Sequence, residues 1–212
     1  MEHANYQFLD YIVAKESPEN YGLVVDIGSH VGDFIIGAKE AFGSSVEIIA
    51  FEPDEENYKN NLKRVKFYSD VTVHPVGIFY GKTESQVLVC KRENPGGYVI
   101  EASEYSDGCK RLHGMSVREN VIFNLVELEE ILTESPFVVK IDCESSEYNI
   151  LKNSQILRTA KYIIVEFHID IGIPVDLAYI REFVEENLPT HHIALVGDCH
   201  WRHILLERKE KH

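Results

Sequence analysis

The sequence predicts an α/β fold with a mostly parallel, doubly wound sheet, and three observations support that prediction. Short apolar runs bounded by turn residues alternate with stretches of helical period along most of the 212 residues. Such alternation requires crossover connections, which join parallel strands. Apolar residues make up 44% of the chain, enough for one substantial core. We therefore expect a single domain over residues 1–212.

The first part of the chain is expected to supply an N-terminal extension, three strands and two helices. Asp54 can act as the N-cap of the second helix, and the acidic residues after it suit the positive end of the helix dipole. The extension covers residues 1–21, the strands cover 22–28, 46–53 and 71–78, and the helices cover 31–42 and 54–66.

The pattern changes between residues 79 and 123. Turn signals such as "ENPGG" and "SDGC" separate short alternating runs, including "QVLVC" and "YVIEA". These features predict an antiparallel β excursion inserted into the main sheet, with a mobile loop over about 103–115. We expect the insertion to shape one side of the binding site.

Strand and helix alternate again after the insertion. Asn124 and Glu127 have the spacing of a capping box ahead of "LVELEEIL", which predicts a helix there. The last two apolar runs flank the turn "GDCH" and predict an antiparallel hairpin, which makes the sheet mixed. The remaining expected elements are strands over 136–144, 161–168, 190–197 and 200–208 and helices over 145–153 and 174–187.

Charge and cysteine usage exclude several classes of protein. The formal net charge of −14 should repel nucleic-acid backbones and anionic membranes. The four cysteines are scattered, without the spacing of a disulfide framework or a zinc knuckle. The N-terminus is unlike a signal peptide, and no 18 apolar residues run together. We expect a cytoplasmic protein without nucleic-acid partners or membrane insertion; the sequence does not predict its oligomeric state.

The stretch "VVDIGSHVGDF" predicts a ligand site where a strand turns into a helix. Glycines at Gly28 and Gly32 let a ligand approach the backbone at the carboxyl end of a strand. The spacing lacks the middle glycine of G-x-G-x-x-G, which disfavours a dinucleotide. Glu52, at the end of the next strand, could accept from two vicinal ribose hydroxyls. Asp26 could face an ammonium or sulfonium cation.

A second group of candidates follows two later strands. Asp142 ends "VVKID", with Glu144 and Glu147 on one face of the next helix; the alternative role of these two is charge compensation at a helix N-terminus. His168 closes "IIVEFH", with Glu166 two residues earlier on the same face. A histidine there is a candidate general base, the alternative being a structural histidine.

Asp142, Glu166 and His168 could also supply oxygen and nitrogen ligands to a hard divalent cation. The sequence has no HxH or HExxH spacing there, so a metal is not favoured. His30 in the glycine turn and His113 in the expected loop could contact a ligand, the alternative being ordinary exposed residues.

Four motifs resemble a known family. "VVDIGSHVGDF" followed by "IIAFEPDEENY" resembles the first two motifs of class I S-adenosylmethionine-dependent methyltransferases. "VVKIDCESSEYNIL" and "KYIIVEFH" are similar to the "IKIDVEGAE…L" and "E-x-H" blocks of FkbM-type methyltransferases. The resemblance covers residues 22–168 and implies a Rossmann-like methyltransferase fold. It also implies methyl transfer from S-adenosylmethionine, most often to a hydroxyl of a sugar or another small metabolite.

The residues and the resemblance together assign candidate roles. His168 and Asp142 are the expected catalytic residues, and Glu144, Glu166 and His113 are expected to contact a small-molecule or carbohydrate acceptor. Residues expected to bind the cofactor are Asp26, Gly28, Ser29, His30, Gly32, Glu52, Pro53 and Asp142.

Two departures from the family pattern leave another class of function open. Ser145 stands where the family usually has glycine, and Ser146 where it often has alanine. A catalytically inactive S-adenosylmethionine-binding or regulatory module is therefore the alternative. A nicotinamide-dependent oxidoreductase is disfavoured by the missing dinucleotide fingerprint.

Overall fold

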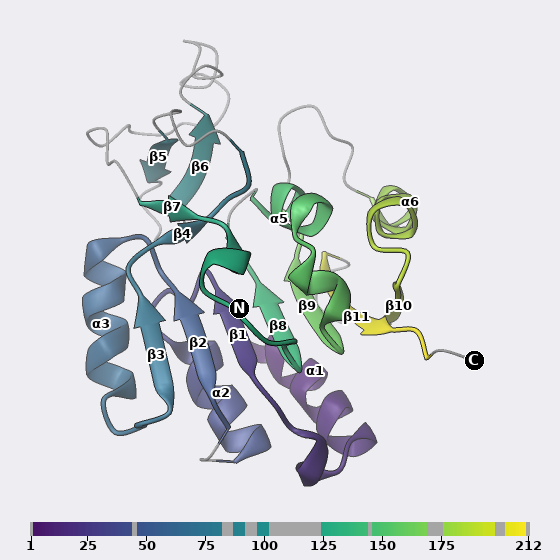
Figure 1. Cartoon of the computed structure of the whole chain (residues 1–212), viewed down its shortest axis with the longest axis horizontal. Helices are drawn as coiled ribbons and strands as arrows, with labels where there is room; N and C mark the ends of the chain where they lie inside the picture. The colour runs from purple at the N-terminus through teal and green to yellow at the C-terminus, as the bar shows by residue number, and fades with distance from the viewer. Residues whose placement is uncertain are drawn as a thin grey trace.

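The computed structural model describes most of the chain, and at its centre lies one seven-stranded sheet, in the order β10-β11-β9-β8-β1-β2-β3 (Figure 1). The described residues are 2–43, 46–81, 87–91, 97–101, 124–143, 146–168, 176–197 and 202–210. The strands of the sheet are β1 (Val24–Ile27), β2 (Ile48–Phe51), β3 (Val71–His74), β8 (Val138–Ile141), β9 (Tyr162–Glu166), β10 (His191–Val196) and β11 (His203–Arg208).

The helices cover both faces of this sheet, as a doubly wound fold requires. The α-helices are α1 (Glu2–Lys15), α2 (Asp33–Phe42), α3 (Glu55–Val65), α5 (Glu147–Asn153) and α6 (Leu177–Asn187), and the 3₁₀ turns are η1 (Pro18–Asn20), η2 (Leu128–Glu130) and η3 (Ile156–Thr159). Side chains of β1 alternate between the faces, because successive strand residues point in opposite directions. Val24 packs in a core with Phe8 of α1 and Ile35 of α2, whereas Val25 packs in a core with Ile150 of α5 and Val184 of α6.

The parallel part of the sheet has a switch point between β1 and β8. β1 pairs in parallel with β2 on one side and with β8 on the other, and Asp26 lies opposite both Ala50 and Lys140. The chain builds β1, β2 and β3 outward in one direction and later returns to add β8 and β9 on the other side. Ligands bind at the carboxyl ends of strands at such a point. The predicted parallel α/β sheet is confirmed.

The C-terminal strands are antiparallel, as the sequence predicts. β11 pairs antiparallel with β9, and β10 pairs antiparallel with β11. β11 therefore lies between two strands that precede it in the chain. The register of the hairpin shifts between Ile193 and Leu195, which marks a bulge in the edge strand β10.

The expected helix after the insertion is wrong. Residues Leu125–Val126 form a short strand, β7, which pairs with β4 (Gly77–Ile78), and only a 3₁₀ turn follows. The capping box forms three residues later than expected, between Glu127 and Glu130. Strand pairing across the fold has overridden a local helical signal.

Other boundaries also differ from the expected ones. The strand predicted over 71–78 divides into β3 and β4 around Pro75, which has no N–H to donate to a neighbouring strand. The N-terminal extension contains α1, which we did not predict. Phe8, Leu9 and Ile12 of α1 are buried, and their spacing of three and four residues was the available signal. Asp54 caps α3 as predicted, accepting from the backbone N–H groups of Glu56 and Asn57.

Within the insertion the structure describes one antiparallel pair. β5 (Val87–Lys91) pairs with β6 (Gly97–Glu101), in agreement with the expected antiparallel excursion. The two strands lie beyond the carboxyl ends of β1, β2 and β3 (Figure 1). The loop expected over 103–115 lies outside the described residues. Within the described ranges, no helix has both the length and the apolar character needed to span a bilayer.

Candidate active site

The glycine turn after β1 brings the ends of two strands into contact. Gly28 has φ +78°, and a Cβ at this position would lie 1.9 Å from the carbonyl oxygen of Asp142. Gly32 has φ +88°, and a Cβ there would lie 2.7 Å from Asn61 Oδ1. Both glycines are therefore required by backbone conformation and by close packing. His30 also adopts a positive φ, of 48°, which is uncommon without glycine.

Glu52 follows β2 and is held against this turn. Its Oε2 accepts from the backbone N–H of His30 at 2.7 Å, and its Oε1 accepts from that of Asp54 at 2.9 Å. Burial raises the pKa of Glu52, although the two backbone donors oppose that shift. Each carboxylate oxygen keeps a second lone pair. The Glu52 carboxylate can therefore accept hydrogen bonds from hydroxyl groups of a ligand while the two backbone donors hold it in place.

Two of the expected cofactor-binding residues, Ser29 and Asp26, have side chains that are buried within the protein. Ser29 is 3% exposed, and its Oγ accepts from Asn61 Nδ2 at 2.8 Å, which fastens the turn to α3. Asp26 is completely buried. Pro53 is partly buried and connects Glu52 to the cap of α3.

Lys140 is the main residue that the sequence reasoning missed. It lies on β8 opposite Asp26, and its Nζ is 3.3 Å from Asp26 Oδ1 and 3.3 Å from Asp142 Oδ2. The same nitrogen donates to the carbonyl oxygen of Gly28 at 2.7 Å. Lys140 therefore connects the carbonyl group of Gly28, in the turn, to the carboxylate of Asp142 at the end of β8. A lysine inside the apolar run "VVKI" was the signal, because lysine is almost never fully buried unless it is paired.

Charge pairing determines the ionisation of this buried group. Burial would lower the pKa of Lys140, but the carboxylates of Asp142 and Asp26 raise it above the ordinary value. Burial raises the pKa of Asp26, and Lys140 opposes that shift. Lys140 thus remains a cation beneath the site.

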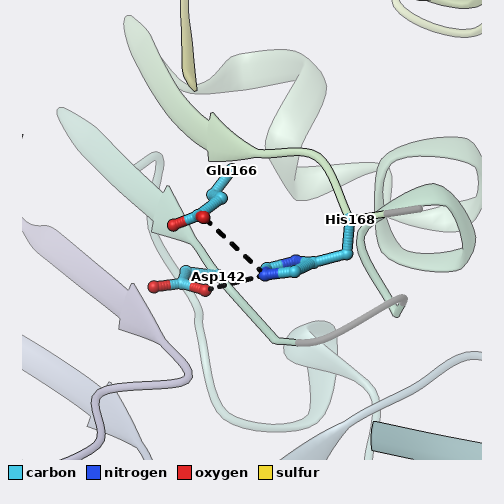
Figure 2. A group of neighbouring side chains, drawn as sticks. All are labelled: Asp142, Glu166 and His168. Carbon is cyan, nitrogen blue, oxygen red and sulfur yellow. Dashed lines mark ion pairs between the residues drawn. The ribbon is translucent and has the colours of Figure 1, made fainter. Parts of the chain in front are cut away.

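Three of the predicted site residues lie together at the carboxyl ends of β8 and β9. Figure 2 shows His168 facing Asp142 and Glu166. His168 Nε2 lies 3.8 Å from Asp142 Oδ1 and 3.8 Å from Glu166 Oε1. The side chains are only partly exposed, at 15% for His168, 28% for Asp142 and 20% for Glu166. A small polar group can therefore reach all three.

Two further residues contact this cluster: Glu147 contacts His168, and His203 contacts Glu166. His168 Nδ1 lies 2.7 Å from Oε1 of Glu147, the first residue of α5, whose side chain is fully buried. Glu166 Oε2 lies 2.9 Å from His203 Nε2, at the start of β11. Burial would raise the pKa of Glu166, but the hydrogen bond and charge of His203 hold it below the ordinary value. No local motif marked His203, because it reaches the site only through the antiparallel insertion of β11 between β9 and β10.

The cluster has the donor atoms for more than one kind of chemistry. Asp142, Glu166 and His168 each offer one ligand atom, and these atoms lie within 4.8 Å of one another. One nitrogen and two carboxylate oxygens suit a divalent cation. The same groups suit a general base with two carboxylates beside it. Glu144 and His113, which the sequence also assigned to the site, lie outside the described residues.

Comparison with solved structures identifies the fold. The fold matches class I methyltransferases, whose sheet is Rossmann-like. A methyltransferase FkbM from Methylobacillus flagellatus KT has a TM-score of 0.56 and 17% identity, over 90% of this chain and 44% of that one. An rRNA-methylase described as putative, from Clostridium thermocellum, has a TM-score of 0.54 and 12% identity, over 100% and 99% of the two chains. An O-methyltransferase described as putative, from Klebsiella pneumoniae, has a TM-score of 0.51 and 13% identity, over 97% and 80%.

The sequence assigns the family within that class. The model of the methyltransferase FkbM domain matches residues 26–188, so the chain belongs to the FkbM methyltransferase family, as its motifs predict. Membership implies S-adenosylmethionine as the methyl donor. The chain spans less than half the length of the Methylobacillus protein. A search of curated protein sequences gave no match.

Proposed function

We propose that this protein transfers a methyl group from S-adenosylmethionine to a hydroxyl oxygen of a sugar or another hydroxylated small metabolite. The observation that carries the proposal is the cluster of His168, Asp142 and Glu166 beside the glycine turn. The turn and the cluster are adjacent because Gly28 lies directly against the backbone of Asp142.

The donor occupies the carboxyl ends of β1 and β2 in this proposal. The donor lies against the turn from Gly28 to Gly32, and Glu52 accepts from the two ribose hydroxyls. Lys140 and Asp26 support the turn from below. Asp142 is the residue that borders both the donor and the acceptor, since it contacts Lys140 on one side and faces His168 on the other.

The chemistry of the cluster favours a neutral, hydroxylated acceptor. Its three groups present hydrogen-bond acceptors, so they match a ligand that brings hydroxyl donors. The carboxylates of Asp142 and Glu166 would repel an anionic group, and the chain as a whole carries a formal charge of −14. Both features disfavour a polyphosphate such as RNA, although three of the similar structures are RNA or rRNA methylases by name, two of them described as putative.

The reaction itself needs orientation and one proton acceptor. The acceptor oxygen attacks the methyl carbon, the carbon–sulfur bond breaks, and its electron pair returns to sulfur as the sulfonium becomes a neutral thioether. The hydroxyl proton passes to His168 Nε2, with Asp142 beside it. Holding the two reactants in line can contribute about 7 to 11 kcal/mol. General base catalysis adds a factor of about 10² to 10⁴.

A divalent cation is a competing role for the same three residues, and we do not favour it. The ammonium group of Lys140 lies 3.3 Å from Asp142 Oδ2 and already supplies positive charge to that carboxylate. Dialysis against a chelator should therefore leave methyl transfer unchanged, whereas activity that returned only with added Mg²⁺ or Mn²⁺ would assign the cluster to a metal.

The first test is isothermal titration of the protein with S-adenosylmethionine and its demethylated product, with NAD as the control ligand. Binding of the first two alone supports the donor site; binding of none, by protein shown to be folded, would overturn it. Transfer of a labelled methyl group is then measured over a panel of sugars and other hydroxylated metabolites. Donor binding without transfer to any of them would favour the inactive binding module.

His168→Ala tests the base in an active preparation. Turnover should fall by about 10² to 10⁴, the range of general base catalysis, with donor affinity nearly unchanged. His192→Ala is the matched control, because His192 is exposed on β10. If His168→Ala instead weakened donor binding and left turnover at saturating donor unchanged, the base assignment would be wrong.

A further inference from the structure

We infer that Asn61 of α3 is a positioning residue for the methyl donor: it fixes the turn after β1 so that the backbone N–H of His30 holds Glu52 in place for the ribose. The use of Glu52 by the donor rests on the proposed function. The structural part of the inference, the order of the turn at His30, can be measured without any ligand.

Asn61 lies on the face of α3 that meets the turn. It is fully buried, although asparagine is neither a strong helix former nor a residue that prefers the interior. Its Nδ2 donates to Ser29 Oγ at 2.8 Å and to the carbonyl oxygen of His30 at 3.3 Å. Because a carbonyl oxygen can only accept, the amide nitrogen must be the atom that faces the turn.

The amide oxygen of Asn61 indicates that this side chain does more than fill space. Among the described residues Oδ1 has no hydrogen-bond partner, and burying an unpaired acceptor is unfavourable. This oxygen occupies the space that Gly32 leaves, since a Cβ at Gly32 would lie 2.7 Å from it. A leucine has the same branched shape and would bury no unpaired oxygen. The contribution of the amide is therefore the two hydrogen bonds that its nitrogen donates to the turn.

The turn determines where the Glu52 carboxyl group lies. His30 has φ +48°, a strained conformation for a residue with a side chain, and in it the His30 N–H donates to Glu52 Oε2 at 2.7 Å. Asn61 holds Ser29 on one side of His30 and the carbonyl group of His30 on the other. Without these bonds the turn can relax, and the N–H would move away from Glu52. A carboxyl oxygen accepts in either protonation state, so the charge of Glu52 does not enter.

A second side chain of α3 holds the next residue of the turn. Arg64, three residues after Asn61 and so on the same face of the helix, donates from Nη1 to the carbonyl oxygen of Val31 at 3.2 Å. Arg64 is exposed, whereas Asn61 is buried. Water can replace the exposed hydrogen bond but has no access to the buried ones, so Asn61 should have the larger effect on the turn.

Two variants that remove the amide test the inference. Asn61→Leu keeps the branched shape, and Asn61→Ala suits a helix if leucine does not fit. Each should raise the Kd for S-adenosylmethionine in isothermal titration by about 10-fold, the order of one net hydrogen bond. In hydrogen exchange followed by NMR without ligand, the His30 amide should exchange about 10-fold faster relative to the amides of the central strand β1.

The matched control is Val65→Ala, one turn further along α3, where the side chain is buried but apolar. It should lower stability and leave both the donor Kd and the relative exchange at His30 unchanged. Folded Asn61 variants that bind S-adenosylmethionine as tightly as the wild type would overturn the inference. An unchanged relative exchange rate at His30, or an equal effect of Val65→Ala, would also overturn it. If exchange at His30 rises as expected but the wild type does not bind S-adenosylmethionine, the positioning of the turn holds and the proposed function fails.

Discussion

At the residue scale, the site depends on charged groups that are buried and paired. Lys140 balances Asp26 and Asp142, His203 balances Glu166, and Glu147 holds His168. Removing one partner from such a set leaves a charge that is neither solvated nor paired, which typically costs about 3–5 kcal/mol. The pairs therefore connect the stability of the fold to the geometry of the site.

Glu52 provides the prediction that separates donor binding from catalysis. Glu52→Gln should weaken S-adenosylmethionine binding by about 10- to 100-fold, since a hydrogen bond to a charged group contributes about 1.5–3 kcal/mol. Isothermal titration measures the change directly. Glu47→Gln is the control, because Glu47 is exposed and lies before β2, at the opposite end from the site. Equal affinity in wild type and Glu52→Gln would show that Glu52 does not bind the ribose.

At the element scale, the turn after β1 lies against the end of β8 with no room for a side chain at Gly28. Gly28→Ala would place a methyl group 1.9 Å from a backbone oxygen of Asp142, in a backbone conformation with φ +78°. We expect a loss of more than about 3 kcal/mol in the free energy of unfolding, from strain and from separation of the two strands.

Gly43→Ala is the matched control for this prediction. Gly43 also has a positive φ, of 98°, but a Cβ there would have nothing within 4 Å. Its cost should be limited to backbone strain, on the order of 1–3 kcal/mol. Urea denaturation of both variants compares the two costs. If Gly28→Ala were no less stable than Gly43→Ala, the close approach would not constrain the turn.

The elements that the sequence predicts well are those with a purely local signal. The strands around Asp26, Lys140 and Ile164 are apolar runs, the first two each interrupted by one charged residue, and their alternation with helices predicts a parallel sheet. The short strand β7 and its pairing with β4 escaped prediction, because this pairing joins segments 47 residues apart in the sequence, as between Gly77 and Asn124. Pairings of that kind leave no periodic pattern to detect.

The residues of the candidate site also divide into those that a local sequence signal predicts and those that only the complete fold brings to the site. Asp142, Glu166 and His168 were predictable as a group, since the carboxyl ends of neighbouring parallel strands meet at one edge of a sheet. His203 was not, because it comes from an antiparallel strand whose place in the sheet is decided by the whole fold. For Glu147 the sequence left two alternatives open, a role in the site and a helix-end charge, and its contact with His168 depends on the exact start of α5.

At the scale of the whole molecule, His191 should make stability depend on pH. It is 1% exposed, its Nε2 lies 3.0 Å from the carbonyl oxygen of Ala160, and burial lowers its pKa to about 4. Between pH 6.5 and about 4 the unfolded state therefore binds a proton that the folded state does not, so stability falls as the pH falls. From pH 7 to pH 5 this contributes a loss of about 2 kcal/mol.

Urea denaturation at the two pH values measures this loss, and His191→Asn should reduce it by a similar amount. His192→Asn, at an exposed neighbouring position, should leave it unchanged. Asp26 and Glu52 act in the opposite direction, because their pKa values are raised in the folded state and their protonation stabilises it at acid pH. A His191→Asn variant with the wild-type pH dependence would contradict the assignment.

The position of β11 determines when this molecule can become active during its synthesis. β9 carries Glu166 to the site, but the strand that pairs with it and supplies His203 is made about 40 residues later, after α6 and β10. On the ribosome, β9 therefore remains an open edge, and β10 has no neighbour in the sheet, until residues 203–208 have emerged. If the protein has the proposed function, methyl transfer should begin only once that strand has been inserted, and chains that end before residue 203 should show no turnover of S-adenosylmethionine.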